Sequence, residues 1–531
     1  MSQRALQARR RGVSCYFPAL AFAAVLAWLA PAADGSASDG DARNAQKAAQ
    51  SSPAFRAGFA ERDVTPDVGM EMMGNYGKEF GTSIHDPCKV RAAVFDDGRT
   101  RVALVGLDAL MIHRDSVERV RKAIEERCGI PAGSVLLGAS HSHSSGPVGW
   151  VMPGEFDRDP QWIQDLAYRL SPCANPVYLE RFEKGIVDAV LQANAARTEA
   201  RLSFASGRED GVAFNRRLRM KNGRTFTHPG QGNPDTLGYA GPTDPEVGVI
   251  GAWDGEGRLL GVIVNFSCHA TTSPPGFSAN WIYYLEKTIR GALDTEAPVV
   301  FLQGACGDIT QVDNLSNAVP LSGDRQARIV GGCVGAEVVK RLLTAWPGAG
   351  GKLDVRTKTL RIACRRPDPE RVRRCEAIVR GATPDPASTD WIFAKEIILL
   401  DAMAARSPSV DVEVQAVQVG PAVFVANPAE YFVELGLEIK KRSPHERTWV
   451  VELANGCVGY VPTEEAFSPA GGGYETRLTS FSSLEVSAGR KIVEASIDLL
   501  KALTPASSPA APAAPAFRAP WSYGDVPPEF K

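Results

Sequence analysis

Histidine is scarce in this chain: only seven occur among 531 residues, and two of these lie one residue apart in GASHSHSSGP, at positions 138–147. An excess of basic charge is also missing, because the net charge at pH 7 is −2 and the isoelectric point is about 6.4. Without a positive field the chain lacks the electrostatic footprint of a nucleic-acid-binding protein. We therefore expect no nucleic-acid partner.

Cysteines at metal-binding spacing are absent. The chain has ten cysteines, but none form a CxxC pair or a zinc-ribbon pattern, which excludes the common thiolate zinc modules. Cys364 and Cys375 are close in sequence and form a candidate disulfide. Cys268 and Cys306 lie in apolar, glycine-rich stretches, where cysteine usually serves as a small core residue.

Long apolar runs are missing everywhere except near the N-terminus. There the basic stretch MSQRALQARRR precedes CYFPALAFAAVLAWLAPAA and a group of small residues, a pattern that predicts a signal peptide over residues 1–37. An uncleaved membrane anchor is the alternative, although the apolar run is shorter than the ~20 residues that a spanning helix prefers. A signal peptide predicts an exported protein, periplasmic or extracellular.

Internal repeats are absent, and the composition is that of an ordinary globular protein, with 44% apolar and 23% charged residues. Residues 38–56 are polar and alanine-rich, which predicts a disordered leader. Residues 57–503 form one expected large domain. Residues 504–531 are rich in proline and alanine and are expected to be an extended or disordered tail.

Apolar strands and amphipathic helices alternate through this domain. Strands are expected at residues 90–98, 101–110, 134–143, 259–270 and 297–308, a hairpin at 416–430 and a strand at 447–457. Helices are expected at 114–130, with Asp115 and Ser116 as its cap, and at 178–196, 280–293 and 334–346, with a helical hairpin at 367–406. This order predicts an α/β fold with mixed sheets.

Several of these strands end in polar residues: His141 and His143, His269, Asp308, and Glu430. In α/β sheets, ligands gather at the carboxyl ends of strands, so we expect these side chains to share one crevice. Two histidines at i and i+2 on an extended chain point to the same side. The pair is compatible with a metal site and with a hydrogen-bonded turn that uses Ser142 and Ser144, and spacing alone does not identify a completing carboxylate.

Further segments make the sequence similar to the neutral ceramidase family through most of residues 57–500. GASHSHSSGP resembles the family's THTHSGPG, NFSCHATT its second histidine segment, and NPAEYFVELG its PGEF-type segment. NGCVGYVPTEEAF and GGYETRL resemble the tyrosine-containing stretch followed by Tyr-Glu. IHDPCKVRAAVFDDG, VAFNRRLRM and QGACGDITQ resemble three further segments of that family in the same order.

The resemblance implies a set of site residues and a single mixed-sheet catalytic domain. The implied zinc ligands are His141, His269, Glu430 and Tyr460. Two imidazoles and a carboxylate are ordinary zinc ligands that leave room for water, whereas a phenolate ligand rests on the resemblance alone. The implied catalytic residues are His143, which contacts substrate or water, Tyr474, which donates to the carbonyl oxygen, and Asp308 and Thr310, which line the site. Arg216 is the implied substrate-binding residue.

The sequence also departs from the family's pattern. Thr310 stands where the family has its proposed serine nucleophile, Gln311 and Val312 replace a Pro-Asn pair, and Asn280 replaces an aspartate. The resemblance ends near the end of the family's catalytic domain, so we expect the C-terminal β-sandwich of many ceramidases to be missing. The Trp-containing segment at 148–172 either roofs the pocket or packs as ordinary core. These differences predict a smaller or more soluble N-acyl substrate than long-chain ceramide.

The expected function is therefore that of an exported zinc-dependent amidohydrolase, which cleaves an amide bond in an N-acyl compound with metal-activated water. One alternative is an esterase, lactonase or carbamate hydrolase on the same site, because stabilising an oxyanion does not discriminate amide from ester. Another is a non-catalytic zinc-binding or lipid-binding relative. The expected partner is a small-molecule or lipid N-acyl substrate, with peripheral membrane contact left open and the oligomeric state not predicted.

Overall fold

The structure is a computed structural model that describes residues 54–318, 321–381, 385, 387–516 and 527–531. The predicted signal peptide and residues 38–53 of the predicted leader lie outside the described residues. None of the helices that the structure describes has the length and apolarity needed to cross a lipid bilayer.

The first sheet has the strand order β6-β5-β4-β1-β7. Its strands are β1 (Arg56–Asp63), β4 (Lys89–Asp96), β5 (Arg101–Leu107), β6 (Val135–Ala139) and β7 (Thr198–Glu199). Neighbours are antiparallel except β5 and β6, which are parallel and are connected through helix α2 (Arg114–Cys128) and the short 3-10 helix η1 (Ala132–Ser134). Helices α2 and α4 (Pro176–Ala195) pack on one face of this sheet.

The second sheet has the order β15-β14-β13-β8-β17. Its strands are β8 (Arg201–Arg208), β13 (Glu246–Trp253), β14 (Leu259–Phe266), β15 (Val299–Gln303) and β17 (Gly348–Ala349). Only β14 and β15 are parallel, and helix α5 (Trp281–Leu293) connects them. Helix α6 (Gly323–Thr344) packs against α5 and across β8 and β13.

The third sheet has the order β18-β19-β20-β22. Its strands are β18 (Leu353–Ala363), β19 (Ser409–Val419), β20 (Ala422–Ala426) and β22 (Arg447–Val451). Strands β20 and β22 are parallel and are connected through helix α9 (Val433–Arg442). Helix α10 (Ala488–Lys501) packs on β18, β19 and α9.

One topological unit therefore occurs in each of the three sheets. An antiparallel strand pair leads into a helix, and the helix returns the chain to a parallel neighbour: β4-β5-α2-β6, β13-β14-α5-β15 and β19-β20-α9-β22. The sequences of these segments show no repeat, because each unit needs only buried strands and an amphipathic helix. Parallel neighbours bring their carboxyl ends to the same edge of a sheet, which is where binding residues gather.

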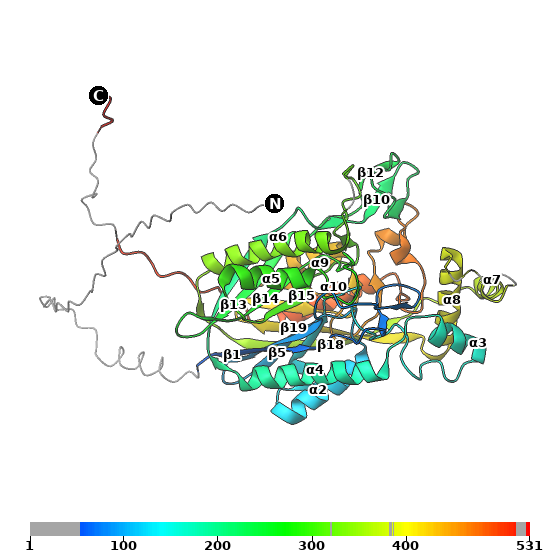
Figure 1. Cartoon of the computed structure of the whole chain (residues 1–531), viewed down its shortest axis with the longest axis horizontal. Helices are drawn as coiled ribbons and strands as arrows, with labels where there is room; N and C mark the ends of the chain where they lie inside the picture. The colour runs from blue at the N-terminus through cyan, green and yellow to red at the C-terminus, as the bar shows by residue number, and fades with distance from the viewer. Residues whose placement is uncertain (1–53, 319–320, 382–384, 386, 517–526) are drawn as a thin grey trace, which may run out of the picture. The chain divides into compact units, whose positions relative to one another are not determined.

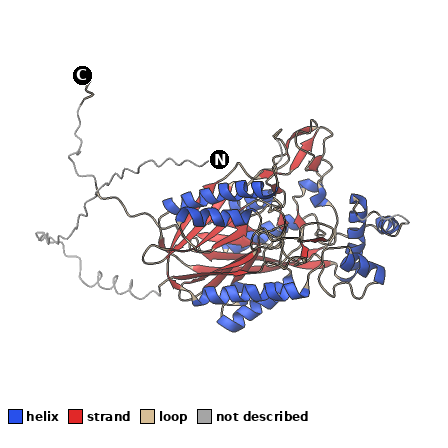
Figure 2. Cartoon of the chain, viewed as in Figure 1, coloured by secondary structure: helices blue, strands red, loops and turns tan. Residues whose placement is uncertain are grey.

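The strands are stacked between two outer layers of helices (Figures 1 and 2). Helices α5 and α6 lie on one side of the strands, and α2 and α4 lie on the other. A central apolar cluster joins the inner faces of the three sheets, with Phe95, Ile263 and Trp449 among its buried members. Because both faces of the inner strands are covered, these strands are apolar on both sides instead of alternating.

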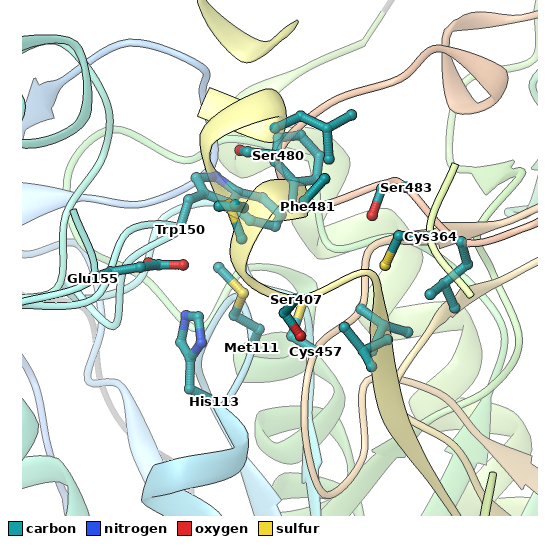
Figure 3. A pocket seen from close by; sticks show the side chains of 16 residues that line it. Met111, His113, Trp150, Glu155, Cys364, Ser407, Cys457, Ser480, Phe481 and Ser483 are labelled. Carbon is teal, nitrogen blue, oxygen red and sulfur yellow. The ribbon is translucent and has the colours of Figure 1, made fainter. Parts of the chain in front are cut away.

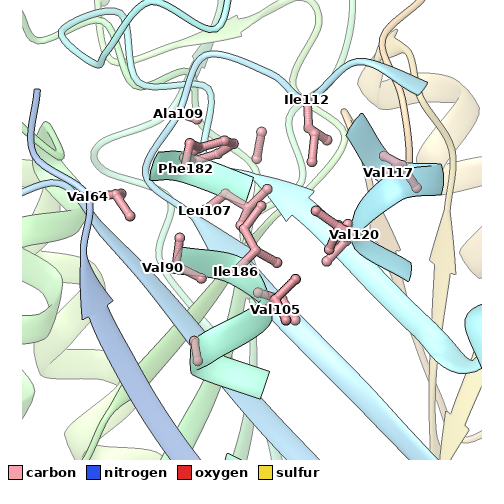
Figure 4. Packing of buried hydrophobic residues seen from close by; sticks show 14 of the residues in the cluster. Val64, Val90, Val105, Leu107, Ala109, Ile112, Val117, Val120, Phe182 and Ile186 are labelled. Carbon is pink, nitrogen blue, oxygen red and sulfur yellow. The ribbon is translucent and has the colours of Figure 1, made fainter. Parts of the chain in front are cut away.

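The outer face of the first sheet shows how the sequence sets this packing. Asn175 accepts hydrogen bonds from the amides of Val177 and Tyr178 and so caps α4, with Pro176 in the first turn. Phe182 and Ile186 follow at helical spacing and pack on strand residues such as Val90 and Val105 (Figure 4). Truncating a buried phenylalanine of this kind to alanine costs about 3–5 kcal/mol.

Smaller elements surround the ends of the strands. They are β2 (Glu71–Met72) with β3 (Glu79–Phe80), β9 (Phe214–Asn215) with β16 (Ile309–Thr310), β10 (Arg217–Met220) with β11 (Thr225–Thr227) and β12 (Thr236–Tyr239), and β21 (Glu430–Tyr431) with β23 (Tyr460–Val461). Short helical turns occur at α3 (Gln161–Gln164), η2 (Asp165–Arg169), η3 (Glu465–Phe467) and η4 (Tyr474–Thr476). Helices α7 (Pro369–Val379) and α8 (Thr389–Arg406) form the expected helical hairpin.

The mixed α/β architecture is confirmed, and two local expectations are wrong. Helix α2 begins one residue before Asp115, and His113 occupies its N-cap with no side-chain cap hydrogen bond. Cys364 and Cys375 are not paired, because Cys364 lies beside the third sheet, bridged to Leu484, while Cys375 packs among the helices of the α7–α8 hairpin. Cys268 and Cys306 are fully buried, as expected of core residues.

Candidate metal centre

The polar residues at the strand ends meet at one place. His141 follows β6, His269 follows β14, and Glu430 follows β20 as the first residue of β21. Glu430 is the direct partner of Tyr460 in the parallel β21–β23 pair. The three parallel strand units therefore each contribute to one cluster.

The two neighbouring histidines face the same cavity, but not by the expected extended geometry. His141 has a backbone φ of 60°, in the left-handed region that non-glycine residues rarely adopt and that costs about 1–3 kcal/mol. The amide of His143 donates to the Ala270 carbonyl, and Ser142 forms a bridge with Ala270. The first histidine segment is thereby held beside the segment that contains His269.

Each of the three imidazoles is oriented by a backbone carbonyl. The Nδ1 atoms of His141, His143 and His269 lie 2.9, 3.0 and 2.6 Å from the carbonyl oxygens of Leu110, Gly74 and Cys306. A carbonyl oxygen only accepts hydrogen bonds, so each Nδ1 carries a proton, and in a neutral ring Nε2 then presents a lone pair. Carbonyl partners of this kind fix the tautomer of metal-binding histidines.

The three ring nitrogens converge. One ligand atom from each of His141, His143 and His269 lies within 4.8 Å of the others, and the Nε2 atoms of His141 and His143 are 3.1 Å apart. Two lone pairs at that distance repel each other unless a cation or a proton lies between them. This juxtaposition is the arrangement that a metal-binding group requires.

Glu430 completes the cluster. Its Oε2 atom lies 3.2 Å from Nε2 of His141 and 3.6 Å from Nε2 of His269. Burial raises the pKa of the Glu430 carboxyl, but the two imidazoles outweigh burial and bring the pKa well below its usual range. Glu430 Oε2 and His269 Nε2 are both buried and have no hydrogen-bond partner among the described residues, so each has a lone pair available for a ligand.

Protonation differs among the histidines. Burial lowers the pKa of His269 to about 3. Burial and the neighbouring His141 and His269 hold the pKa of His143 well below its usual value. Burial also disfavours the charged form of His141, but Glu430 outweighs it and raises the pKa. Two of the three rings are therefore neutral at physiological pH, which is the form that binds metals.

Two tyrosines and an arginine lie beside Glu430. The hydroxyl oxygens of Tyr460 and Tyr474 are 3.0 Å apart, and the guanidinium of Arg216 lies 5.5 and 5.1 Å from the centres of their rings. Arg216 Nε donates to Glu475 and Nη2 donates to the Gly307 carbonyl, at 2.9 and 2.7 Å. Burial raises the pKa of Tyr474 to about 12, although Arg216 acts in the opposite direction.

A cavity of about 80 Å³ opens onto these groups. It is lined by Gly74, Asn75, Tyr76, His141, His143, Trp150, Glu430, Tyr460, Tyr474 and Phe481. Gly74 has a φ of 138°, and a Cβ there would lie 2.7 Å from the His143 carbonyl oxygen. Only glycine can therefore approach the histidine segment this closely.

Asp308 and Thr310 are not among the residues that line this cavity, and neither are His269 and Arg216, so the predicted roles of Asp308 and Thr310 stay predictions. Asp308 Oδ1 accepts from the amide of Val433 at the start of α9, and Oδ2 accepts from Asn215, at 2.9 and 2.8 Å. Asp308 therefore connects β9 to α9. The buried Thr310 hydroxyl donates to the side chain of its neighbour Gln311 at 3.2 Å.

Other residues at the site were not predicted. Glu475, which holds Arg216, directly follows Tyr474 in sequence and could have been found from that position. Glu452 directly follows β22, so it could have been predicted in the same way as the other polar residues at strand ends. Tyr76 and Phe481 pack ring to ring at 5.8 Å across the cavity, and no sequence pattern connects them.

Comparisons with known proteins show what the chain is similar to in sequence and in fold. No family model matches the chain. Neutral ceramidase from Pseudomonas aeruginosa is 27% identical over 224 residues, which is 41% of this chain and 30% of that protein, so the match spans less than a third of the relative. The crystal structure of neutral ceramidase from Pseudomonas aeruginosa superposes with a TM-score of 0.64 at 20% identity, covering 86% of this chain and 76% of that one.

A structure of ceramidase complexed with C2 superposes similarly, with a TM-score of 0.62 at 19% identity, covering 86% of this chain and 77% of the other. The fold of this chain is thus that of a neutral ceramidase, and its local sequence similarity is to the same protein. The resemblance to the neutral ceramidase family that the sequence motifs predicted is confirmed in sequence and in fold.

Proposed function

We propose that the chain is a zinc-dependent hydrolase that cleaves the amide bond of an N-acyl compound. The observation that carries the proposal is the convergence of three carbonyl-oriented imidazoles and the Glu430 carboxylate on one point. The 27% sequence identity to a neutral ceramidase over 224 residues supports an N-acyl amide as the class of substrate.

The donor set fits zinc. Tetrahedral ligands about 2.1 Å from zinc are roughly 3.4 Å from each other. The spacings of 3.1 Å between His141 and His143, 3.2 Å between His141 and Glu430, and 3.6 Å between His269 and Glu430 bracket that value. His141, His269 and Glu430 would hold the ion together with Tyr460, while His143 is available either to bind it or to contact the substrate. Zinc in such a site supplies Lewis acidity and activates water at neutral pH.

The chain's own groups would perform the remaining steps. Nε2 of His143 carries a lone pair at the cavity wall, so it can accept a proton from the attacking water and later return it to the leaving nitrogen. Tyr474 keeps its proton because its pKa is about 12, so its hydroxyl can donate a hydrogen bond to the substrate oxygen as charge develops there. Arg216, fixed by Glu475 and Gly307, positions both tyrosine rings.

The test is a mass-spectrometric screen of the purified protein, with and without zinc, against N-acyl amides that include ceramides, with matched esters in the same panel. Elemental analysis of His141→Ala and His269→Ala should show loss of metal together with loss of turnover. His445→Gln is the matched control, because His445 is also buried and bonded to a backbone carbonyl but lies away from the cluster. Full metal occupancy in both site variants, or turnover of esters alone, would overturn the proposal.

Export is a separate proposal, supported by the basic and then apolar pattern of residues 1–37. Expression of the full chain in a bacterial host, followed by fractionation and N-terminal sequencing, tests it. Cleavage near residues 33–37 is expected, and an intact N-terminus in the cytoplasmic fraction would contradict it.

A further inference from the structure

A second cavity adjoins the cavity of about 80 Å³ that opens onto the histidine cluster, which is called the metal cavity below. It has a volume of about 180 Å³, and Trp150 and Phe481 line both cavities. The two rings are stacked, with centroids 4.2 Å apart and planes 29° from parallel. Among the described residues these two side chains are the ones common to both linings, so the stacked pair lies between the cavities. Figure 3 shows Trp150 and Phe481 together at the wall of the second cavity.

The wall of the second cavity is largely apolar. Its larger aliphatic and thioether side chains are Met111, Leu400, Met403, Val410, Val458 and Leu484. Two of these, Leu400 and Met403, come from α8, so the helical hairpin supplies one side of the cavity. Flexible methionine side chains at such a wall adapt to irregular apolar ligands.

Several polar side chains of this wall already have partners. His113 Nε2 lies 2.8 Å from the Gly149 carbonyl oxygen, and Glu155 accepts from the Met152 amide at 3.0 Å, so both hold the loop that carries Trp150. The Ser480 hydroxyl donates to Glu396 at 2.6 Å. These groups therefore stabilise the cavity wall, and the space that remains favours an apolar ligand over a charged one.

The volume limits what can enter. An apolar cavity of roughly 150 Å³ is large enough to bind benzene. The cavity of about 180 Å³ therefore suits a group of about six to eight non-hydrogen atoms, such as a short alkyl chain or one aromatic ring. A sixteen-carbon chain has roughly twice that number of atoms, so about half of it would lie outside this space.

We propose that this second cavity is a subsite for the apolar end of the substrate's acyl group, and that it selects short alkyl or single-ring acyl groups. The inference rests on the proposed amide hydrolysis at the adjoining metal cavity. The acyl group passes the edge of the Trp150–Phe481 pair, which only side-chain rotation needs to open, and its carbonyl remains beside His143 and Tyr474. This assigns the specificity of the site to a cavity built partly by α8.

The first test is an acyl series of p-nitroanilides from acetyl through butyryl, hexanoyl and octanoyl to palmitoyl. Each methylene that becomes buried raises kcat/KM by about fourfold. We expect that rise to stop between hexanoyl and octanoyl, and phenylacetyl to equal the best alkyl group. A rate that climbs steadily to palmitoyl would overturn the proposal.

The second test fills the cavity from α8. Ala404 is buried in the lining, while the adjacent Ala405 is exposed and outside it, so Ala404→Phe and Ala405→Phe are matched variants. Ala404→Phe should reduce the hexanoyl-to-acetyl ratio of kcat/KM at least tenfold, and Ala405→Phe should leave it unchanged. Ala404→Met provides a milder filling if the phenylalanine variant unfolds. Equal ratios in Ala404→Met and Ala405→Phe, with both proteins folded, would contradict the subsite.

Calorimetric binding of hexanoate, with acetate as the comparison, separates this inference from the proposed function. Tighter binding of hexanoate than of acetate that is lost in Ala404→Phe supports the subsite, even if no amide is hydrolysed. Hydrolysis of N-acyl amides with an acyl preference that ignores Ala404 would uphold the proposed function and refute the subsite.

Discussion

The Cys306 thiol donates a hydrogen bond to the Glu452 carboxyl group, with Sγ and Oε1 2.9 Å apart. The other carboxylate oxygen accepts from the amides of Cys306 and Tyr431, each at 2.8 Å. Because the Cys306 carbonyl orients His269, and Tyr431 directly follows Glu430, this fully buried glutamate connects the supports of two site residues. Mutation of a residue that supports metal ligands through hydrogen bonds commonly lowers metal affinity by about 10–100-fold.

Glu452 is therefore expected to act as a positioning residue for metal binding. Glu452→Ala leaves two buried amides unsatisfied and should weaken zinc binding by about 10–100-fold. Glu452→Gln keeps an oxygen for both amides and should restore most of the affinity. Competition with a zinc chelator measures it, and Glu413→Ala, which removes a buried carboxylate paired with Arg121, is the control for general destabilisation. Wild-type affinity in Glu452→Ala would refute this role.

Removal of the Tyr474 hydroxyl should affect turnover but not metal content. Tyr474→Phe keeps the ring beneath Arg216 but loses the donor, so kcat should fall by about 10²–10³-fold while KM changes little. Steady-state kinetics and elemental analysis on the same preparation check both points. Tyr178→Phe removes a buried hydroxyl that bonds to the Val64 carbonyl, away from the site, and should keep the wild-type kcat. An unchanged kcat in Tyr474→Phe would remove it from the mechanism.

The strand ends were the part of the site that sequence could predict. His141, His269 and Glu430 each follow an apolar strand, and binding residues gather at such ends. The rule does not say that these three ends meet, because the strands belong to three different sheets. The same rule places Asp308 near the site but says nothing of its direction, and in the structure its carboxylate faces the start of α9. Side-chain direction depends on the local turn, as the left-handed backbone of His141 illustrates.

Contacts between distant segments were not predictable from periodicity. Arg216 pairs with Glu475 across 259 residues, and Trp150 stacks on Phe481, which lies still farther along the chain. Neither pair leaves a local pattern, because each depends on how loops from different sheets meet. The 148–172 segment was expected either to roof the pocket or to pack as core, and it does both: Trp150 lines the cavity while Phe156 and Leu166 are buried against the helical hairpin.

A buried ion cluster between β4 and α5 predicts a specific dependence of stability on pH. Burial raises the pKa of Glu286, but Arg91 and Lys89 outweigh it and lower the pKa to about 2. A lowered carboxyl pKa stabilises the fold above the unfolded value near 4.5, and that stability is lost as the pH falls toward 2. The shift corresponds to about 3 kcal/mol.

Glu286→Gln should therefore unfold about 3 kcal/mol more easily than wild type at pH 7, because it leaves Arg91 and Lys89 without their shared partner. The difference should shrink between pH 4.5 and 2, where the wild-type carboxyl becomes protonated. Denaturant unfolding at several pH values measures it. Glu118→Gln, in an exposed pair with Arg114, should change stability by less than about 1 kcal/mol. A difference that stays constant with pH would contradict the assignment.

Thr310 provides the last prediction, on the source of the attacking oxygen. Its hydroxyl is buried, donates to Gln311 at 3.2 Å, and is absent from the lining of the metal cavity. His143, in contrast, lines that cavity and is within reach of a water molecule that enters it. Thr310→Ala should therefore keep kcat/KM within about tenfold of wild type, or about 1.4 kcal/mol of transition-state stabilisation. Intact-mass spectrometry during turnover checks the same point, because an acyl group trapped on Thr310 would show that the threonine hydroxyl, and not water, attacks the substrate.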